Sequence, residues 1–533
     1  MSARVTVEAT IYGAATAWLY VAAKQMHMLE GMQRLPMALG TMVLLLVAST
    51  YATIHARVYL PLTTIKWTRS ESDCGMVVGV MLVPLVLASR LVVEYAHNKI
   101  CQVIGLGLTT LLRVFIKLPW SFKSAPIDFV IGSALFLSLP ESFGVELWHV
   151  LLTLIMYNIV LTFGIIALPR SFTFGEAIIM SEGCTYIIVD VLLYTLHELN
   201  LVETRFIPHH DATTIVSQLV LVCGLLLCAI TTPLFQRYGS SSPRKLQPSL
   251  PFLPSLIFLG LVGLVGIIFL LWSSFLLGVP VWVWLLNKIM EPMATKVIIF
   301  WLFMLGVAVP LCPIISKLLT LRQIVSRKLY HFLAVAMFLP ASYWDIDLLR
   351  LSYAIAVGVF MIVECVRALA VPPFGLPISK FVSAYLDRRD EGRVILTHTY
   401  LLLGCALPVW LSPNFGSLLT VNAGVLALGI GDAMGAIVGS SYGRHKVCGN
   451  KSLEGSAAVF VSMVLFGLKS VQSYHELGMN ENSSQIISPA VIAFFGSAWL
   501  TTTLEAVTCQ IDNLVLPLFY FTLCGITEAY ANF

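Results

Sequence analysis

The sequence contains few charged residues. Lysine, arginine, aspartate and glutamate make up 11% of its 533 residues, whereas hydrophobic residues make up 58% and the mean hydropathy is +0.88. Soluble globular domains carry about 25% charged residues. This shortage excludes a soluble domain and predicts an integral membrane protein. The formal net charge of +4 is small and says little about partners, and no nucleic-acid partner is expected.

Three kinds of motif are also missing. The 11 cysteines include no C-x-x-C pair, which excludes the common zinc and redox motifs. No segment has the G-x-x-x-x-G-K-S/T spacing of a P-loop, so a phosphate-binding loop would have to be of another kind. Short alternating strands are absent, which argues against a β-barrel. These absences favour an all-α membrane protein.

Apolar runs long enough to cross a bilayer as helices recur from one end of the chain to the other. We therefore expect a polytopic transmembrane helical bundle of about 15–17 spans. The expected spans begin near Ala9, Pro36, Cys74, Cys101, Pro126, Glu146, Gly175, Thr213, Pro251, Ala294, Leu329, Leu351, Thr397, Leu418, Gly455, Ser488 and Leu514.

The basic residues are unevenly divided between the loops. With the N-terminus in the cytosol, the loop after each even-numbered span is rich in lysine and arginine, as around Arg327 and Arg444. An excess of positive charge is typical of cytosolic loops. The polar segment 237–250 is predicted to be a cytosolic linker. It separates an N-terminal transmembrane region, 1–236, from a C-terminal region, 251–533, where the polar motifs are concentrated.

The most informative segment is 429–455. It places Asp432 in an apolar stretch rich in glycine, and a polar loop with glycines, hydroxyls and cations follows at 440–454. A carboxylate inside a membrane is costly and marks a functional candidate. Glycines, free N–H groups and lysines suit a nucleotide triphosphate, and acids suit Mg²⁺. The segment therefore predicts a phosphate-binding loop.

Four polar segments of the C-terminal half are separated from one another by pairs of expected spans. They lie at 326–331, 372–398, 440–454 and 505–513. Segments separated by an even number of spans emerge on the same side of the membrane. We expect these four to form one active site in loops on the cytosolic face.

Acids, lysines, arginines and glycines gathered in this way suit phosphoryl transfer. That reaction needs metal-bridged phosphates, cations near the developing charge and a positioned hydroxyl group. Because many spans surround the site, the acceptor is expected to be a lipid alcohol. The alternative is a lipid or ion transporter that uses Asp432. Transporters usually have broken helices in two corresponding halves, whereas here the polar motifs are confined to one half.

The same residues resemble those of dolichol kinases, polytopic enzymes of the endoplasmic reticulum that phosphorylate dolichol with CTP. The resembling segments are 327–331, 386–392 with 395–404, 429–432 with 439–440, 451–455, 505–506 with 510–517 and, in the N-terminal half, only 172–176. The resemblance implies CTP as the donor, dolichol or a polyprenol as the acceptor, and Mg²⁺ or another divalent cation. It also implies an endoplasmic reticulum membrane location with cytosolic catalytic loops, and a product that carries sugars for N-glycosylation. Phytol and diacylglycerol kinases share the central motifs, so a kinase for another lipid alcohol is a further alternative.

On this resemblance we assign roles to individual residues. The residues expected to bind the nucleotide are Ser440, Ser441, Gly443, Arg444, Lys446, Lys451, Ser452, Glu454 and Gly455. Asp432, Glu454 and Asp512 are expected to be catalytic residues that bind the metal. Either Asp387 or His398 is expected to orient or deprotonate the dolichol hydroxyl, and the sequence does not decide between them. No oligomeric state is predicted.

Overall fold

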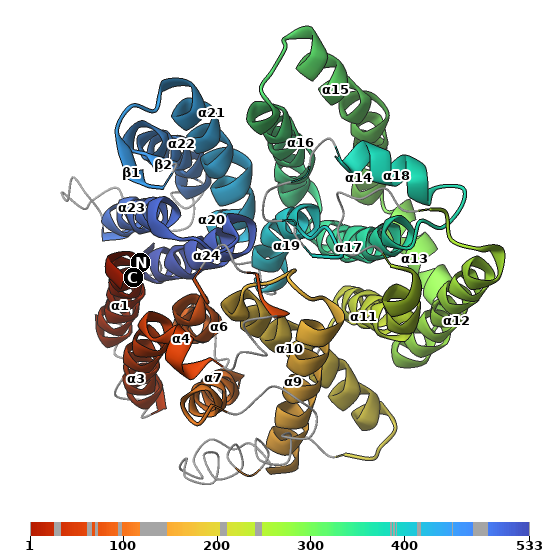
Figure 1. The fold of residues 1–533 in the computed structure, drawn as a ribbon, viewed down its shortest axis with the longest axis horizontal. Helices are drawn as coiled ribbons and strands as arrows, with labels where there is room; N and C mark the ends of the chain where they lie inside the picture. The colour runs from red at the N-terminus through yellow and green to blue at the C-terminus, as the bar shows by residue number, and fades with distance from the viewer. Residues whose placement is uncertain are drawn as a thin grey trace.

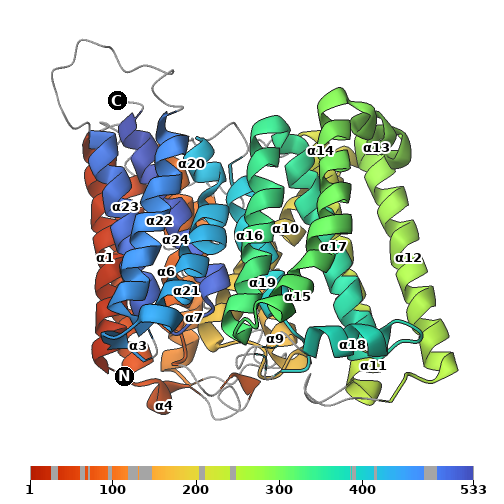
Figure 2. The same cartoon turned by 90° about the horizontal axis from the view of Figure 1, so that it is seen from above.

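A computed structural model describes most of the chain. The described residues are 2–25, 34–60, 67–69, 73–93, 99–117, 130, 147–202, 210–239, 248–383, 386, 390, 392–412, 417–449, 451–472 and 489–531. These residues are overwhelmingly helical, and most of the long helices run side by side (Figures 1 and 2). The all-α prediction is therefore confirmed.

The helices of the N-terminal half follow the expected spans. They are α1 (Ser2–Gln25), α3 (Arg34–Ile54), α4 (Ala56–Tyr59), α6 (Met76–Val93), α7 (Lys99–Phe115), α9 (Leu147–Ala167), α10 (Phe174–Glu198) and α11 (Ala212–Tyr238). The span expected near Pro126 lies outside the described residues, as does most of the linker predicted at 237–250.

The C-terminal half begins with α12 (Phe252–Leu277) and ends with α24 (Asp512–Ala531). Between them lie α13 (Val281–Met290), α14 (Pro292–Phe303), η3 (Met304–Ala308), α15 (Val309–Leu318), α16 (Gln323–Trp344), α17 (Ile346–Ala368), α18 (Gly375–Ser383), α19 (Thr397–Trp410), α20 (Leu418–Val421), η4 (Val425–Asp432), α21 (Ala433–Tyr442), α22 (Leu453–Gln472) and α23 (Pro489–Val507). Every expected span of this half coincides with one or more of these helices.

Nine helices of the described part are long and apolar enough to cross a membrane, and five shorter apolar helices accompany them. The chain is thus a multi-pass membrane protein. The number of spans in the whole chain stays a prediction, because several of the shorter helices border segments outside the described residues.

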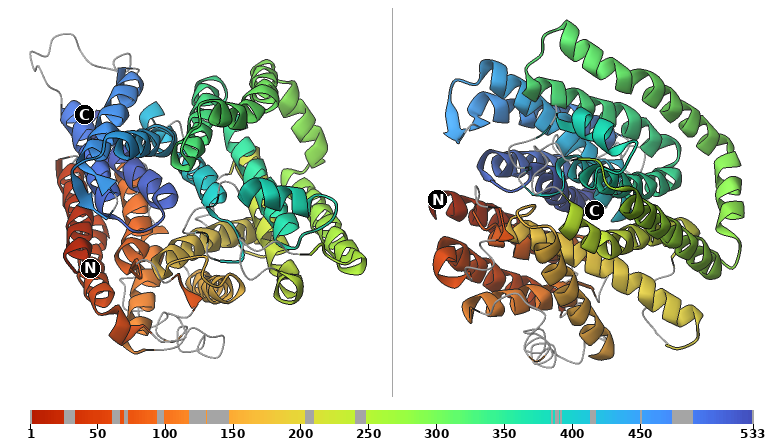
Figure 3. Two further views of the ribbon diagram at one scale, coloured as in Figure 1. Left: turned by 45° about the horizontal axis from the view of Figure 1, so that its top comes forward. Right: turned by 45° about the vertical axis from the view of Figure 1, so that its right-hand side comes forward.

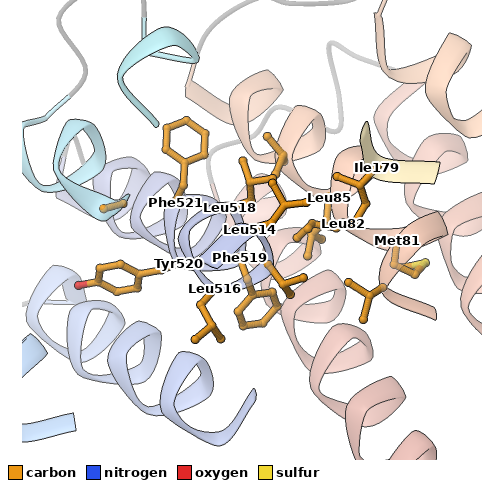
Figure 4. Close-up of a cluster of buried hydrophobic side chains, with 14 of the residues drawn as sticks. Met81, Leu82, Leu85, Ile179, Leu514, Leu516, Leu518, Phe519, Tyr520 and Phe521 are labelled. Atoms are coloured by element: carbon orange, nitrogen blue, oxygen red, sulfur yellow. The ribbon is translucent and has the colours of Figure 1, made fainter. Parts of the chain in front are cut away.

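Helix α24 lies at the centre of the packed core. It packs against α6, α19 and α23, and nearly all of its side chains are buried. Figure 4 shows Leu514, Leu518 and Phe519 of α24 beside Leu82 and Leu85 of α6. A helix that is apolar on all sides is stable only when other helices surround it or lipid does, and here other helices surround it. The end of the chain is therefore packed against its beginning, and the start of α24 is fixed relative to both halves.

A short β-hairpin interrupts the helices. Strand β1 (Lys446–Cys448) pairs antiparallel with β2 (Lys451–Ser452), with Lys446 opposite Ser452. Gly449 in the turn has a φ of +56°, a conformation that glycine adopts without steric cost. The hairpin occupies the loop that was predicted to bind phosphate and ends directly at α22.

The bundle has two distinct ends. One end holds α4, α18 and the hairpin, and the other holds α13 and α20 (Figure 2). We call them the site end and the far end. The starts of α16 and α24 lie at the site end, so the polar segments there are close in space, as the even number of spans predicted. Ion pairs from Lys451 to Glu505 and Asp512, and a hydrogen bond from Asn513 to Thr397, show that three of the four segments converge.

Candidate active site

Lys451 is at the centre of a cluster of acids. It follows the hairpin turn, and its Nζ donates a hydrogen bond to Glu505 near the end of α23. The same Nζ lies 3.3 Å from Oδ2 of Asp512, the first residue of α24. Burial alone would lower the pKa of Lys451, but the charges of Asp512, Glu505 and Asp432 outweigh it and raise that pKa above its usual value. The lysine therefore stays protonated.

Asp432 forms a second cluster at the boundary between η4 and α21. Lys328 on α16 donates a hydrogen bond to Asp432 Oδ2, and His331 Nε2 lies 3.4 Å from the same oxygen. Residues three apart share one face of a helix, so Lys328 and His331 point at the acid together. The Lys328 and Asp432 side chains are only 13% and 10% exposed. The costly intramembrane carboxylate is thus paired.

The two clusters are near enough for their charges to interact, since Lys328 and Lys451 both act electrostatically on Asp432. We call Lys328, Asp432, Lys451, Glu505 and Asp512 the lysine–acid network, which combines two lysines with three acids at the site end. In the absence of a ligand, the lysines and the carboxylates neutralise one another. A ligand that carries both negative and positive charge could bind to the lysines and the carboxylates at the same time.

The predicted nucleotide loop surrounds this network. Ser452 is buried, and its Oγ accepts a hydrogen bond from Gly455 N at 3.2 Å. A Cβ on Gly443 would lie 2.3 Å from Gly439 O and 2.4 Å from Ser452 Oγ, so a glycine is required there. Arg322 donates to the carbonyl of Ser440 at 3.1 Å. The predicted residues Ser441, Arg444 and Lys446 are exposed around the hairpin.

Glu454 is separated from the other two predicted metal ligands. Its Oε1 lies 2.7 Å from His445 Nδ1, and its carboxylate also accepts from the backbone N–H of His445. Among the residues that the structure describes, no group of three histidine, cysteine or acidic side chains is arranged to hold a metal ion. Asp432, Glu454 and Asp512 are therefore not gathered as one ligand set here, because each has a basic partner of its own.

The start of α19 approaches the network from another side. His398 is exposed there, one residue after Thr397. The Thr397 hydroxyl donates to Asp390 Oδ1 at 2.7 Å, and Asn513 Nδ2 donates to Thr397 O at 3.2 Å. Asn513 follows Asp512, so this bond ties the start of α19 to the start of α24. Asp387, the other predicted acceptor-side residue, lies outside the described residues.

A partly buried acid holds the segment that precedes α19. Glu364 accepts from Ile395 N at 2.5 Å and from Arg367 Nε and Nη2 at 2.8 and 2.6 Å. Arg367 in turn donates to Arg393 O at 3.1 Å. The segment that leads to His398 is therefore positioned by an ion pair on α17.

Several residues of this site were absent from the predicted set. Lys328, His331 and Glu505 make its central contacts. The three-residue spacing of Lys328 and His331 was a usable signal, but basic residues at the cytosolic start of a span are normally explained by topology alone. Glu505 lies within a resembling segment, and only the fold places it against Lys451.

The fold and this network define a polytopic membrane protein with a buried lysine–acid site at one end of its helical bundle. The model of the dolichol kinase family matches residues 128–412, more than half of the chain. The chain therefore belongs to the dolichol kinase family. The matched region includes α16 to α18, whereas the hairpin and α24 lie beyond it.

Individual relatives agree with this assignment. The chain is 31% identical to dolichol kinase EVAN of Arabidopsis thaliana over 67% of its own length and 65% of that protein. It is 34% identical to dolichol kinase sec59 of Schizosaccharomyces pombe over 47% of its length and 52% of that protein. With the dolichol kinase of Homo sapiens the identity is 29%, over 71% and 69% of the two chains. The matches to the first two thus span about half to two thirds of those proteins. No solved structure matches the chain.

Proposed function

We propose that the protein is a CTP-dependent dolichol kinase that converts dolichol and CTP into dolichyl phosphate and CDP. Family membership supports the acceptor and the reaction class. The observation that carries the proposal is the network of Lys451, Glu505 and Asp512 beside the Lys328–Asp432 pair. Phosphoryl transfer depends mainly on positioned charges of this kind.

In the proposed reaction, the dolichol oxygen attacks the γ-phosphorus of CTP and forms a new P–O bond. The bond between the γ-phosphorus and the oxygen that bridges it to the β-phosphate breaks, and CDP leaves with the electron pair. The hydroxyl proton passes to His398 or Asp387. Lys451 and Lys328 stabilise the charge that develops on the phosphate oxygens. Arg444 and Lys446 draw the nucleotide to the hairpin.

The resting ion pairs suit the arrival of a nucleotide with its metal. Carboxylates are preferred ligands of Mg²⁺, and Asp432 and Asp512 would hold it. When bound, the ion would neutralise phosphate charge. The two lysines would exchange their carboxylate partners for phosphate oxygens, so no buried charge is left unpaired at either stage. Glu454, held by His445, belongs in this proposal to the nucleotide loop.

We further propose that the site end faces the cytosol from the endoplasmic reticulum membrane. The basic residues around Arg327 and Arg444 favour that side. Cys448 in β1 is a native probe for it, because it is a free, partly exposed cysteine. In sealed microsomes, a membrane-impermeant maleimide should label Cys448 without detergent. Labelling only after permeabilisation would place the site in the lumen and contradict the proposal.

The reaction is tested with purified protein, Mg²⁺ and γ-labelled CTP. Dolichol, phytol and diacylglycerol are offered as separate acceptors, and γ-labelled ATP replaces CTP in a parallel series. We expect label to pass to dolichol from CTP. Transfer to phytol or diacylglycerol alone would correct the acceptor, and transfer from ATP alone would correct the donor. No transfer to any acceptor would leave a transport role as the better explanation.

A further inference from the structure

A buried ion pair of the N-terminal half touches the turn that leads to Asp512. Arg69 Nη2 donates to Glu176 Oε1 at 2.8 Å, and the two side chains are 2% and 0% exposed. The backbone N–H of Ile511 donates to the same oxygen at 2.9 Å. One carboxylate oxygen of Glu176 thus joins Arg69 to Ile511, the residue just before Asp512.

The position of Glu176 follows from the start of α10. Thr173 is the N-cap: its Oγ1 accepts from Glu176 N at 3.2 Å, and Glu176 Oε2 accepts from Thr173 N at 3.0 Å. This reciprocal capping box uses only one oxygen of the carboxylate. The other oxygen, Oε1, is bound by Arg69 and Ile511. Capping therefore explains the contact of only one of the two carboxylate oxygens of Glu176.

Gln510 adds a second connection between the same segments. The Thr173 hydroxyl donates to Gln510 Oε1 at 2.6 Å, and Gln510 Nε2 donates to Asp73 Oδ1 at 2.7 Å. Gly75 N binds that same Asp73 oxygen at 2.9 Å. Gly75 has a φ of +67°, and a Cβ there would lie 2.3 Å from Gln510 Oε1. The side chain of Gln510 is therefore enclosed by the N-terminal half.

We infer that Arg69 and Glu176 are positioning residues for phosphoryl transfer. They hold the 508–511 turn so that Asp512 remains within reach of Lys451, 3.3 Å away. A displacement of about 1 Å at such a site costs up to 100-fold in rate, so the anchor matters although neither residue touches a substrate. This role rests on the proposed kinase function. It gives the N-terminal half a part in the reaction that its sparse polar motifs did not indicate.

Cys509 reports the state of this turn directly. It is a partly exposed cysteine within the turn that forms no disulfide, and the Arg4 guanidinium contacts it. In the purified protein, mass spectrometry measures how fast a maleimide modifies Cys509. The test variants are Glu176→Gln and the double variant Arg69→Met/Glu176→Gln, which leaves no unpaired buried charge. The control is Arg350→Met, which removes a buried arginine at the far end, where its Nη2 donates to Ser412 O.

We expect both test variants to speed the modification of Cys509 several-fold and the control to leave it unchanged. Equal rates in all four proteins would overturn the inference. This measurement needs no kinase activity, so it stays decisive if phosphoryl transfer is never observed. The two failures are thus distinguishable: absent transfer contradicts the proposed function, and unchanged labelling contradicts the positioning role.

A double-mutant cycle then tests how Glu176 acts. Glu176→Gln should lower kcat/KM for CTP about tenfold in the otherwise native protein, and less than about twofold when Asp512 is already Asn. The KM for dolichol should not change in either background. Arg350→Met should combine additively with Asp512→Asn. Additive effects of Glu176→Gln and Asp512→Asn would show that Glu176 merely supports the fold, and would refute the inference.

Discussion

Two groups of apolar helices differ in how much protein surrounds them. In α10 and α11, 50% of the most apolar 18-residue stretch is buried inside the protein. The buried share is only 17% in α12 and 6% in the span formed by α14, η3 and α15. We call α12–α15 the peripheral arc; it curves along one side of the molecule (Figure 3). Mean hydropathy does not decide this division: it is 1.6 and 2.3 for α10 and α11 and 2.6 and 2.5 for α12 and α14–α15, but only 1.2 for α16, in which 17% is buried as in α12.

The comparison shows that hydropathy locates a span but not its neighbours. Lipid tails are as apolar as leucine, so a lipid-facing helix and a protein-facing helix have the same composition. We call the helices that are surrounded by other helices, such as α10, α11 and α24, the packed region. Buried polar contacts distinguish it from the peripheral arc. The lysine–acid network lies on β2, α23, α24 and the η4–α21 junction of the packed region, and on the start of α16, in which only 17% of the apolar stretch is buried. Variants in that region should therefore have large effects, and variants in the arc small ones.

The largest effect is expected from Asp432→Asn. The change keeps the size of the side chain but removes the charge that pairs with Lys328, so turnover should fall at least about 100-fold. The assay is kcat for dolichol phosphorylation at equal amounts of inserted protein. Lys328→Met/Asp432→Asn is the control for folding, since it leaves no buried charge unpaired. It should melt like the native protein and remain inactive; recovered activity would mean that the pair is structural.

The second-largest effect is expected from Lys451→Ala, which should weaken the binding of CTP. A hydrogen bond from a charged group contributes about 1.5–3 kcal/mol, which corresponds to an increase of about 10–100-fold in the apparent KM for CTP. Saturation curves for CTP in membranes measure it. Lys446→Ala, on the exposed strand β1, is the matched lysine variant and should change the KM by less than about fivefold. Equal increases in KM for the two substitutions would show that Lys451 contributes no more to nucleotide binding than an exposed lysine, and would contradict its assignment to the centre of the site.

A pair of leucine variants tests the packing difference itself. Leu514 in α24 is 0% exposed, whereas Leu302 in α14 is 64% exposed. Leu514→Ala should lower the free energy of unfolding by about 2–5 kcal/mol because it leaves a cavity. Leu302→Ala should change it by less than about 0.5 kcal/mol. Reversible denaturation in detergent provides both values. A comparable loss in the two variants would mean that the arc is packed against protein in solution.

The smallest effect is expected from pH. The pKa of Lys451 is raised above its usual value of 10.5 by Asp512, Glu505 and Asp432, against the lowering effect of burial. The stabilisation from its charge is therefore complete below pH 10.5 and is lost only as the pH rises beyond that raised pKa. Between pH 6 and about 9, the KM for CTP should show no inflection due to this lysine. An inflection in that range that moves in Lys451→Arg would contradict the assignment.

The sequence was sufficient to place most of the helices and to predict that polar segments of the C-terminal half meet at one end of the bundle. Helix-length apolar runs and the number of spans between two loops depend only on local composition and counting. The pairing of charges was not predictable in the same way. Lys328 is indistinguishable in sequence from an ordinary cytosolic flanking residue, and only the packing of α16 on η4 brings it to Asp432.

Glu176 illustrates the same limit. Its spacing from Thr173 predicts a helix cap, and the cap is present. Its bond to Ile511, 335 residues further along the chain, depends on the tertiary fold. Glu454 shows the same limit, because the sequence offered it as a metal ligand with Asp432 and Asp512, whereas only the fold reveals its contact with His445.

The π-helical form of η4 has a consequence for the evolution of this segment. Each π turn contains an extra residue compared with an α-helix, and such insertions are frequent at functional sites. The extra residue sets the direction in which Asp432 leaves the helix. At its present length, an α-helical form of the segment would turn Asp432 by about 100°, the rotation of one residue, away from Lys328. Insertions and deletions in 425–432 should therefore be tolerated only where a change between π and α turns absorbs them, so that in this segment length is as constrained as residue identity.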